Sequence, residues 1–164
     1  MKGVRLSLAV VMLATLFSPL RADTIAIAVR ARTVEPEERA LALLAMVEQG
    51  AMDHLFEAGH IVFNLVPDPQ APSSRPAIDE VREGGASLLV IVDVRLELEA
   101  GRGLMPVRAE ITIVSAGTDE VLDNRVFHAD SLGPARDLAA ETAALRLGVL
   151  ASEAALENLG GDAR

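Results

Sequence analysis

The chain has 164 residues, contains no cysteine and carries a formal net charge of −9 at pH 7. Without cysteine it forms neither disulfides nor thiolate metal sites, and it lacks the residue that is lipid-modified in bacterial lipoproteins. Its acidity argues against a nucleic-acid partner, because phosphates would repel it, and the absence of Tyr and Trp removes the usual stacking platforms.

Residues 1–22 have the layout of a secretory signal peptide. Lys2 and Arg5 precede a largely apolar run at residues 6–17, and cleavage is expected between Ala22 and Asp23. This run has 12 residues, whereas a helix that spans a bilayer needs about 20. A retained amphipathic anchor is the alternative. Cleavage would leave 24 acidic and 12 basic residues, so we expect an exported protein, periplasmic or secreted, that is not a lipoprotein and has no integral membrane segment.

The rest of the chain predicts one α/β domain at residues 23–159, followed by a frayed C-terminus at 160–164. Apolar alternation indicates strands, and apolar residues three or four apart indicate helices. Strands are expected at residues 23–31, 60–66, 87–99, 104–114 and 120–129, and helices at 35–59, 77–84 and 134–159.

Glycine and proline mark the boundaries between these elements. Four prolines within residues 67–76 predict a loop. The stretch "REGGASLLVIVDV" at residues 82–94 has glycines beside a strand, as phosphate-binding loops do. In this chain, however, the glycines follow a helix rather than precede one, so they predict a helix cap. We expect structural caps at Gly59 and at Gly84 or Gly85.

The order β-α-β-α-β-β-β-α predicts a mixed five-stranded sheet with helices packed on it. The two helical crossovers call for parallel pairing among the first three strands, and the short turns call for an antiparallel meander afterwards. Right-handed crossovers then favour the strand order 2-1-3-4-5.

Charged residues alternate with apolar ones in the second half of the strand at 87–99, which indicates one covered and one wet face. Turns centred at 102–103 and 117–118 would place opposite charges across neighbouring strands, where each pair contributes roughly 0.2–1 kcal/mol. The polar face is interpreted either as solvated surface or as a partner-docking surface. The expected pairs are Arg95 with Glu110, Glu97 with Arg108, and Glu110 with Arg125.

A crevice is expected where the first two strands end, because open α/β sheets bind ligands at the carboxyl ends of their parallel strands. Arg30, Arg32 and Arg75 could receive an anion there. Four acidic residues in the same loops oppose that interpretation.

The sequence contains no recognisable catalytic or metal-binding pattern. The three histidines, one of them His54 on a helix face expected to be exposed, do not form an H-E-x-x-H motif, and no serine lies within G-x-S-x-G. We therefore expect no catalytic residues, no metal and no cofactor, and a protein that is not an enzyme.

Several segments resemble an envelope-protein fold. They are "LFEAGHIVFNLV", "REGGASLLVIVDVRLE" and "ITIVSAGTDEVL". Gly85, Ala86 and Leu89 fit a pattern that precedes the central strand of this fold, and Gly117 and Val121 fit its last turn. The chain thereby resembles the group that includes the TolB N-terminal domain, the curli secretion lipoprotein CsgG and the penicillin-binding-protein activator LpoB. The resemblance implies an envelope protein that binds partners and performs no chemistry, and it carries over no site residue.

The sequence therefore predicts an exported accessory domain of the bacterial cell envelope that acts through contacts with an envelope protein. One alternative is a small-ligand or anion-binding protein, or an enzyme, that uses the crevice. The other is association with a second copy, through the edge of the last strand or a face of the last helix.

Overall fold

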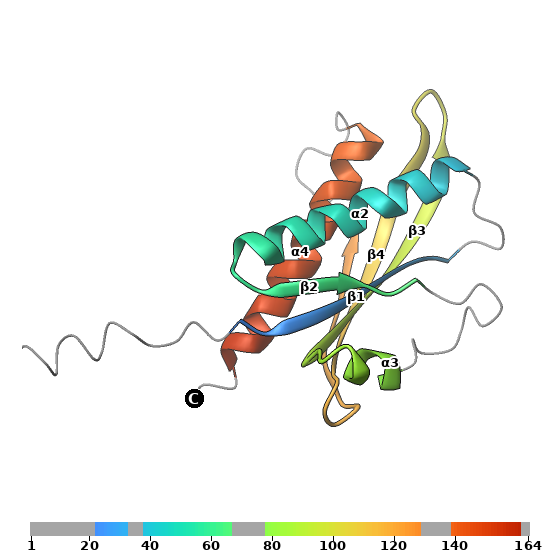
Figure 1. Ribbon diagram of the computed structural model, residues 1–164. Helices are drawn as coiled ribbons and strands as arrows, with labels where there is room; N and C mark the ends of the chain where they lie inside the picture. The colour runs from blue at the N-terminus through green and yellow to red at the C-terminus, as the bar shows by residue number, and fades with distance from the viewer. Residues whose placement is uncertain (1–21, 33–37, 67–77, 129–138, 162–164) are drawn as a thin grey trace, which may run out of the picture.

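The computed structural model describes residues 22–32, 38–66, 78–128 and 139–161, which form a twisted sheet with helices on both faces (Figure 1). The predicted signal peptide, the proline-rich loop and Arg75 lie outside the described residues, apart from Ala22. The strands are β1 Thr24–Ala31, β2 Ile61–Asn64, β3 Leu88–Glu99, β4 Gly103–Ser115 and β5 Val121–His128; the helices are α2 Glu38–Glu57, α3 Ile78–Glu83 and α4 Ala140–Gly161.

The five strands lie in the order β2-β1-β3-β4-β5, as the sequence predicts. β1 is parallel to both β2 and β3, and β3, β4 and β5 form an antiparallel meander. The predicted α/β fold is therefore confirmed. α4 extends to Gly161, two residues beyond its expected end.

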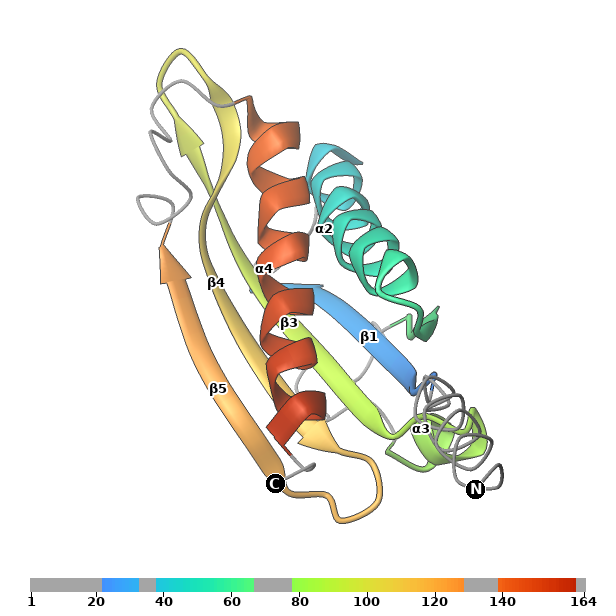
Figure 2. The same ribbon diagram turned by 90° about the vertical axis from the view of Figure 1, so that its left-hand side faces the viewer.

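The two faces of the sheet are covered unequally. α2 and α4 pack on one face and bury the larger core, which includes Ile27, Val90 and Ile111. α3 packs on the opposite face through Val81, over a smaller apolar cluster at one end of the sheet. Figure 2 shows α4 in front of the strands, α2 beside it, and β5 as the outer strand of the sheet. The remainder of the α3 face is left without a helix among the described elements.

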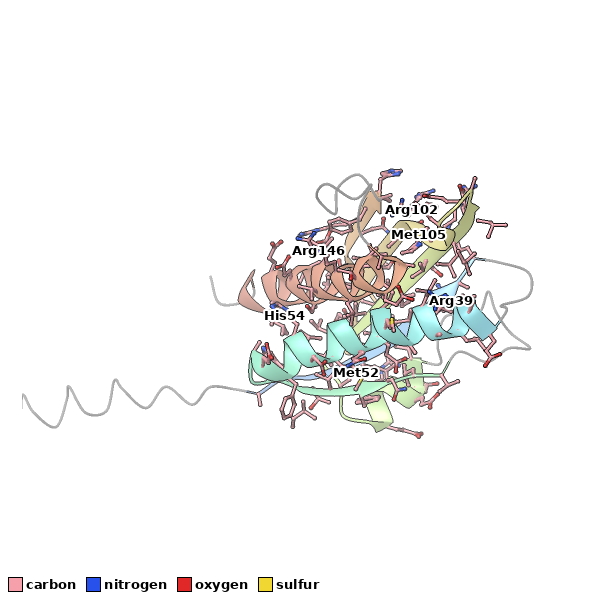
Figure 3. The ribbon with its side chains drawn as sticks, turned by 90° about the horizontal axis from the view of Figure 1, so that it is seen from above. Arg39, Met52, His54, Arg102, Met105 and Arg146 are labelled. Atoms are coloured by element: carbon pink, nitrogen blue, oxygen red, sulfur yellow. The ribbon has the colours of Figure 1, made fainter. Side chains whose placement is uncertain are left out.

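Two glycines allow α2 and α4 to lie very close together. A Cβ on Gly148 would come within 2.1 Å of the Val47 carbonyl oxygen, and a Cβ on Gly50 within 2.3 Å of the Leu145 carbonyl oxygen. From above, Figure 3 shows the two helices side by side. Gly50, which in an isolated helix costs about 1 kcal/mol against alanine, is here needed for helix packing.

His54 lies at this helix interface and not on an exposed face, which corrects the expectation from sequence. Its Nδ1 is 2.6 Å from Oγ of Ser152, a fully buried α4 residue that also donates to the Val149 carbonyl. The hydroxyl is thus provided with partners inside an apolar interface, as a buried polar group requires.

α2 and α3 end in the same capping arrangement. Gly59 and Gly85 have φ values of 90° and 74°. The N–H of each glycine donates to the carbonyl of the residue three positions earlier. The N–H of the next residue donates to the carbonyl five positions earlier, and together these are the hydrogen bonds of a Schellman motif. Gly84 has no positive φ, but its Cα lies against the Phe63 ring, where a Cβ would come within 2.5 Å.

Candidate functional site

A cluster of charged side chains occupies the part of the sheet that α3 leaves open. On β1 this face begins with Ala26 and Ala28 and continues with Arg30, and on β3 it changes from Ile91 to Asp93. Side chains alternate between the two faces of a strand, so the change in residue type turns an apolar floor into a polar one. The cluster, here called the charged face, comprises Arg30, Arg32, Asp93, Arg95, Arg108 and Glu110.

Ion pairs connect three neighbouring strands across the charged face. Arg30 donates to the Asp93 carboxylate over 2.7 Å, and the two side chains are only 18% and 12% exposed. Arg32 donates to Glu110 over 2.8 Å and lies 3.7 Å from Asp93. Arg108 lies 3.7 Å from the same Glu110 oxygen. The two carboxylates are therefore surrounded by arginines, and with Glu97, which pairs with Arg95 at the margin, four arginines stand beside three acids.

The charged face contains a cavity of about 300 Å³. Arg32, Asp93, Arg95, Arg108 and Glu110 line it. Two guanidinium nitrogens, Nε of Arg30 and Nε of Arg108, are buried without a hydrogen-bond partner. Buried donors without a partner are rare and costly, so the charged face retains donor capacity that its own carboxylates do not use.

The pairing of β3 with β4 differs from the expected register. Arg95 lies opposite Arg108, not Glu110, and Asp93 lies opposite Glu110. The turn sits earlier than expected, with positive φ at Gly101 and Gly103, and a shift follows between Arg95 and Leu96. From Leu88 to Arg95 the displacement is two residues, which leaves those side chains on their predicted face while it changes their partners. From Leu96 to Glu99 the displacement is three residues.

Glu97 also has a different partner from the one expected. It pairs in the ladder with Met105 and not with Arg108. Its carboxylate forms an ion pair with Arg95 of the same strand over 2.8 Å. Arg95 and Glu97 are both exposed, so this pair lies at the outer margin of the charged face.

Arg125 does not belong to the charged face, which corrects the predicted surface. It lies opposite Ile111, a core residue under the helices, because the β4–β5 register shifts between Ile113 and Val114. Its guanidinium contacts Asp123 and, on α4, Glu157, each over 2.7 Å. The hydrogen bond with Glu157 is the main reason why the pKa of Arg125 is raised.

The structure brings together residues that the sequence assigned to two separate sites. Arg30 and Arg32 were expected in a crevice, and Arg95, Arg108 and Glu110 on a docking surface; all five belong to one cluster. Asp93, which holds the cluster together, was not predicted as a site residue. Its position directly after the apolar run Leu88–Val92 was the signal that could have found it, because a carboxylate so close to the core needs a cation nearby.

Among the described residues, the charged face included, the structure offers no group of three or more His, Asp or Glu side chains placed to hold a metal ion. None of the described helices is both long and apolar enough to cross a membrane. At the predicted cleavage point, the Asp23 carbonyl accepts a hydrogen bond from Ile61, and its N–H donates to His60 Nδ1.

No family model and no curated protein sequence matches the chain. Among solved structures, it is similar to the PelC dodecamer from Paraburkholderia phytofirmans, at 13% identity and a TM-score of 0.49 over 80% of this chain and 87% of that one. It is similar to TolB from Acinetobacter baumannii, at 14% identity and a TM-score of 0.42, over 86% of this chain and 29% of the TolB chain. It is also similar to the LpoB C-terminal domain from Salmonella enterica, at 12% identity and a TM-score of 0.33, over 73% of this chain and 91% of that one.

Two of the three proteins that the sequence segments resemble, TolB and LpoB, are thus among the similar structures. The predicted resemblance is confirmed as a likeness to these proteins, while the likeness to CsgG stays a prediction. At such identities and TM-scores, the likeness carries no argument about what this chain binds or does.

Proposed function

We propose that the chain is an exported, non-enzymatic binding domain of the bacterial cell envelope, and that its charged face contacts a partner protein. The observation that carries the proposal is the charged face itself. Four arginines gather with two carboxylates on a part of the sheet that no described helix covers, in a chain whose net charge is −9.

The composition of the charged face favours a partner that presents carboxylates. Arg32 and Arg95 are more than half exposed, so their guanidinium groups are accessible. Guanidinium groups bind carboxylates with two parallel hydrogen bonds. Arg30 and Asp93 lie deeper and hold the floor of the face rigid, which lowers the entropy lost when a partner binds.

A binding role is favoured over catalysis because the carboxylates of the charged face are engaged in holding arginines. Asp93 and Glu110 each form short hydrogen bonds to a guanidinium. A general base needs access to the proton that it removes, and these carboxylates are already occupied. Export rests on the predicted signal peptide at residues 1–22, ahead of Asp23.

The proposal is tested by site-specific photo-crosslinking in the cell envelope. A photoreactive amino acid at Arg95, on the charged face, should capture a specific protein, whereas the same probe at Glu153, exposed on α4, should not. The double variant Arg32→Glu, Arg108→Glu, combined with the Arg95 probe, should lose the captured band. Equal capture from both probe positions, or a band unchanged by the double variant, would contradict the proposal.

A second candidate function is binding of a small polyvalent anion in the same cavity. The unbonded Nε atom of Arg108 and the three arginines of the lining favour it. Citrate and pyrophosphate should then raise the melting temperature above that in sodium chloride of equal ionic strength. Arg108→Ala should remove that increase, and Arg39→Ala, which changes an exposed arginine of α2, should keep it. No increase in the unmodified protein would rule this candidate out.

A further inference from the structure

The outer edge of β5 has no partner among the described elements. β5 is the last strand of the sheet and pairs only with β4 (Figure 2). Such an edge presents a row of free backbone donors and acceptors that can pair with another strand. Three apolar side chains of β5 are also well exposed, Val121 at 44%, Leu122 at 41% and Val126 at 41%. The edge therefore has both hydrogen-bonding capacity and apolar surface to bury.

The sequence of β5 is complementary to itself when it is read in the opposite direction. Around Asn124, the residues one step away are Asp123 and Arg125, of opposite charge, and those two steps away are Leu122 and Val126, both apolar. An antiparallel second copy with Asn124 facing Asn124 would place Asp123 opposite Arg125 twice. Opposite charges and apolar residues directly across a ladder stabilise it.

This register is selected by charge over its nearest alternatives. Two antiparallel strands related by a two-fold axis pair residues of the same face, so the axis must pass through a residue that faces its own copy. An axis at Asp123 would place two carboxylates opposite each other. An axis at Arg125 would place two guanidinium groups opposite each other. Like charges directly opposite are destabilising. Only the axis at Asn124 pairs acid with base.

The surroundings of the edge are compatible with this pairing. The regular ladder with β4 runs from Asp123 to His128, and Leu122 is the extra residue at the register shift on its margin. Asp123 and Arg125 are both half-buried against α4, where Glu157 and Asn158 contact them. Asn124 is exposed on the opposite face of the sheet. The charges are thus fixed in place before a second copy arrives.

We infer that two copies of this chain associate through β5, antiparallel and centred on Asn124, so that their sheets join into one continuous sheet. The occupant of the edge is a second copy because the strand carries its own complement in charge and apolarity. The edge adjoins the charged face, because the Asn124 amide donates to Glu110 over 3.4 Å, but the inference rests on the self-complementary sequence of β5 and not on that face.

The first test is charge reversal with complementation. Sedimentation velocity over a concentration series should show a monomer–dimer equilibrium for the unmodified chain. Asp123→Arg and Arg125→Asp should each weaken the dimer about tenfold or more, since each places like charges opposite twice. An equimolar mixture of the two variants should dimerise again, because the mixed pair restores acid opposite base. Circular dichroism and thermal unfolding establish that each variant is folded.

Glu80→Arg is the matched control, because it also reverses one charge but at an exposed residue of α3. This variant should dimerise like the unmodified chain. A monomer at all concentrations would overturn the inference, and so would a mixture of the two variants that remains monomeric.

The second test uses the absence of cysteine from the chain. Facing residues in an antiparallel pair have Cα atoms about 4.5–5.5 Å apart, within the range that a disulfide can bridge. Asn124→Cys should therefore form a disulfide-linked dimer under mild oxidation. Val126→Cys is equally placed on the same strand, but its two copies would lie about 13 Å apart, four residues along the strand. Equal crosslinking of the two variants would contradict the register.

Discussion

At the scale of single residues, the space available beside a glycine decides its role. Gly50 and Gly148 lie where a Cβ would contact the backbone of the opposite helix, and their absence of side chain allows α2 and α4 to pack closely. In sequence, Gly50 appeared as a helix-weakening residue only. Propensity describes a helix in isolation, whereas helix packing depends on the second helix.

Gly148→Ala should destabilise the protein although alanine is the better helix former. The added Cβ would come within 2.1 Å of the Val47 carbonyl oxygen and 2.6 Å of the Ala51 nitrogen. Overpacking of this kind costs about 1–3 kcal/mol. Urea unfolding measures the loss, and Gly117→Ala, whose Cβ would meet nothing closer than 3.9 Å, should change stability much less. A stabilised Gly148→Ala variant would contradict the close helix crossing.

Asp93→Ala should destabilise the protein more than removal of an exposed charge nearby. Arg30, whose side chain is only 18% exposed, would lose its 2.7 Å carboxylate partner. An unsatisfied polar group of this kind costs about 1–3 kcal/mol. Arg95→Ala breaks an exposed pair, which is worth about 0–1 kcal/mol. Unfolding of the two variants in guanidinium chloride should therefore show that Asp93→Ala is the less stable.

At the scale of secondary-structure elements, the helix ends were better predicted than the strand registers. Gly59 and Gly85 have the left-handed conformation that caps α2 and α3, and a glycine just after a helical pattern is a local signal for it. The β3–β4 register depends on where the turn forms among several glycines, and it differs from expectation by two residues at Arg95. A turn is not specified by residue type alone when glycines stand on both sides of it.

Gly85→Ala should destabilise the protein by about 1 kcal/mol, because an L-residue with a Cβ is disfavoured at a φ of 74°. No neighbouring atom lies within 4 Å of the added Cβ, so the loss would come from backbone conformation alone. Gly85→Asn, which tolerates this conformation better, should lose less. Thermal unfolding compares the two variants, and equal losses would contradict the conformational explanation.

The start of α4 has a carboxylate whose ionisation favours the folded state. A hydrogen bond from its own backbone N–H lowers the pKa of Glu141, and Arg39 of α2 lowers it further. A carboxyl with a depressed folded-state pKa contributes stability above its ordinary pKa near 4.5, and the contribution is lost as the pH falls. NMR titration should find the Glu141 pKa below that value. In Arg39→Ala it should move upwards, and an unchanged pKa would show that Arg39 has no part.

At the scale of the whole molecule, the two faces of the sheet are covered unequally, and this determines where the core and the charged face lie. α2 and α4 bury the continuous core on one face, and α3 covers one end of the other. The uncovered remainder is where the charged face lies. The proposed binding surface thus has a packed core behind it, as binding sites on regular elements commonly do.

Leu147→Ala should lower the stability of the whole domain, because Leu147 is 1% exposed in the core between α4 and the sheet. Deletion of a buried leucine side chain costs about 2.7–5 kcal/mol. Leu145→Ala is the matched control on the same helix, since Leu145 is 36% exposed and should cost far less. A single cooperative unfolding transition, shifted only in Leu147→Ala, is the expected calorimetric result. Equal shifts would contradict the assignment of the core.

The sequence by itself determined the elements and their order in the sheet, because apolar periodicity, crossover handedness and short turns act locally or constrain topology strongly. It also determined which residues of β3 and β4 point away from the helices. Only the tertiary structure decided which charges meet. It joined Arg30 and Arg32 of β1 to Asp93 and Glu110, and it turned Arg125 towards α4. Face depends on the two-residue period of a strand, whereas partners depend on register, which turns and bulges set through contacts distant in sequence.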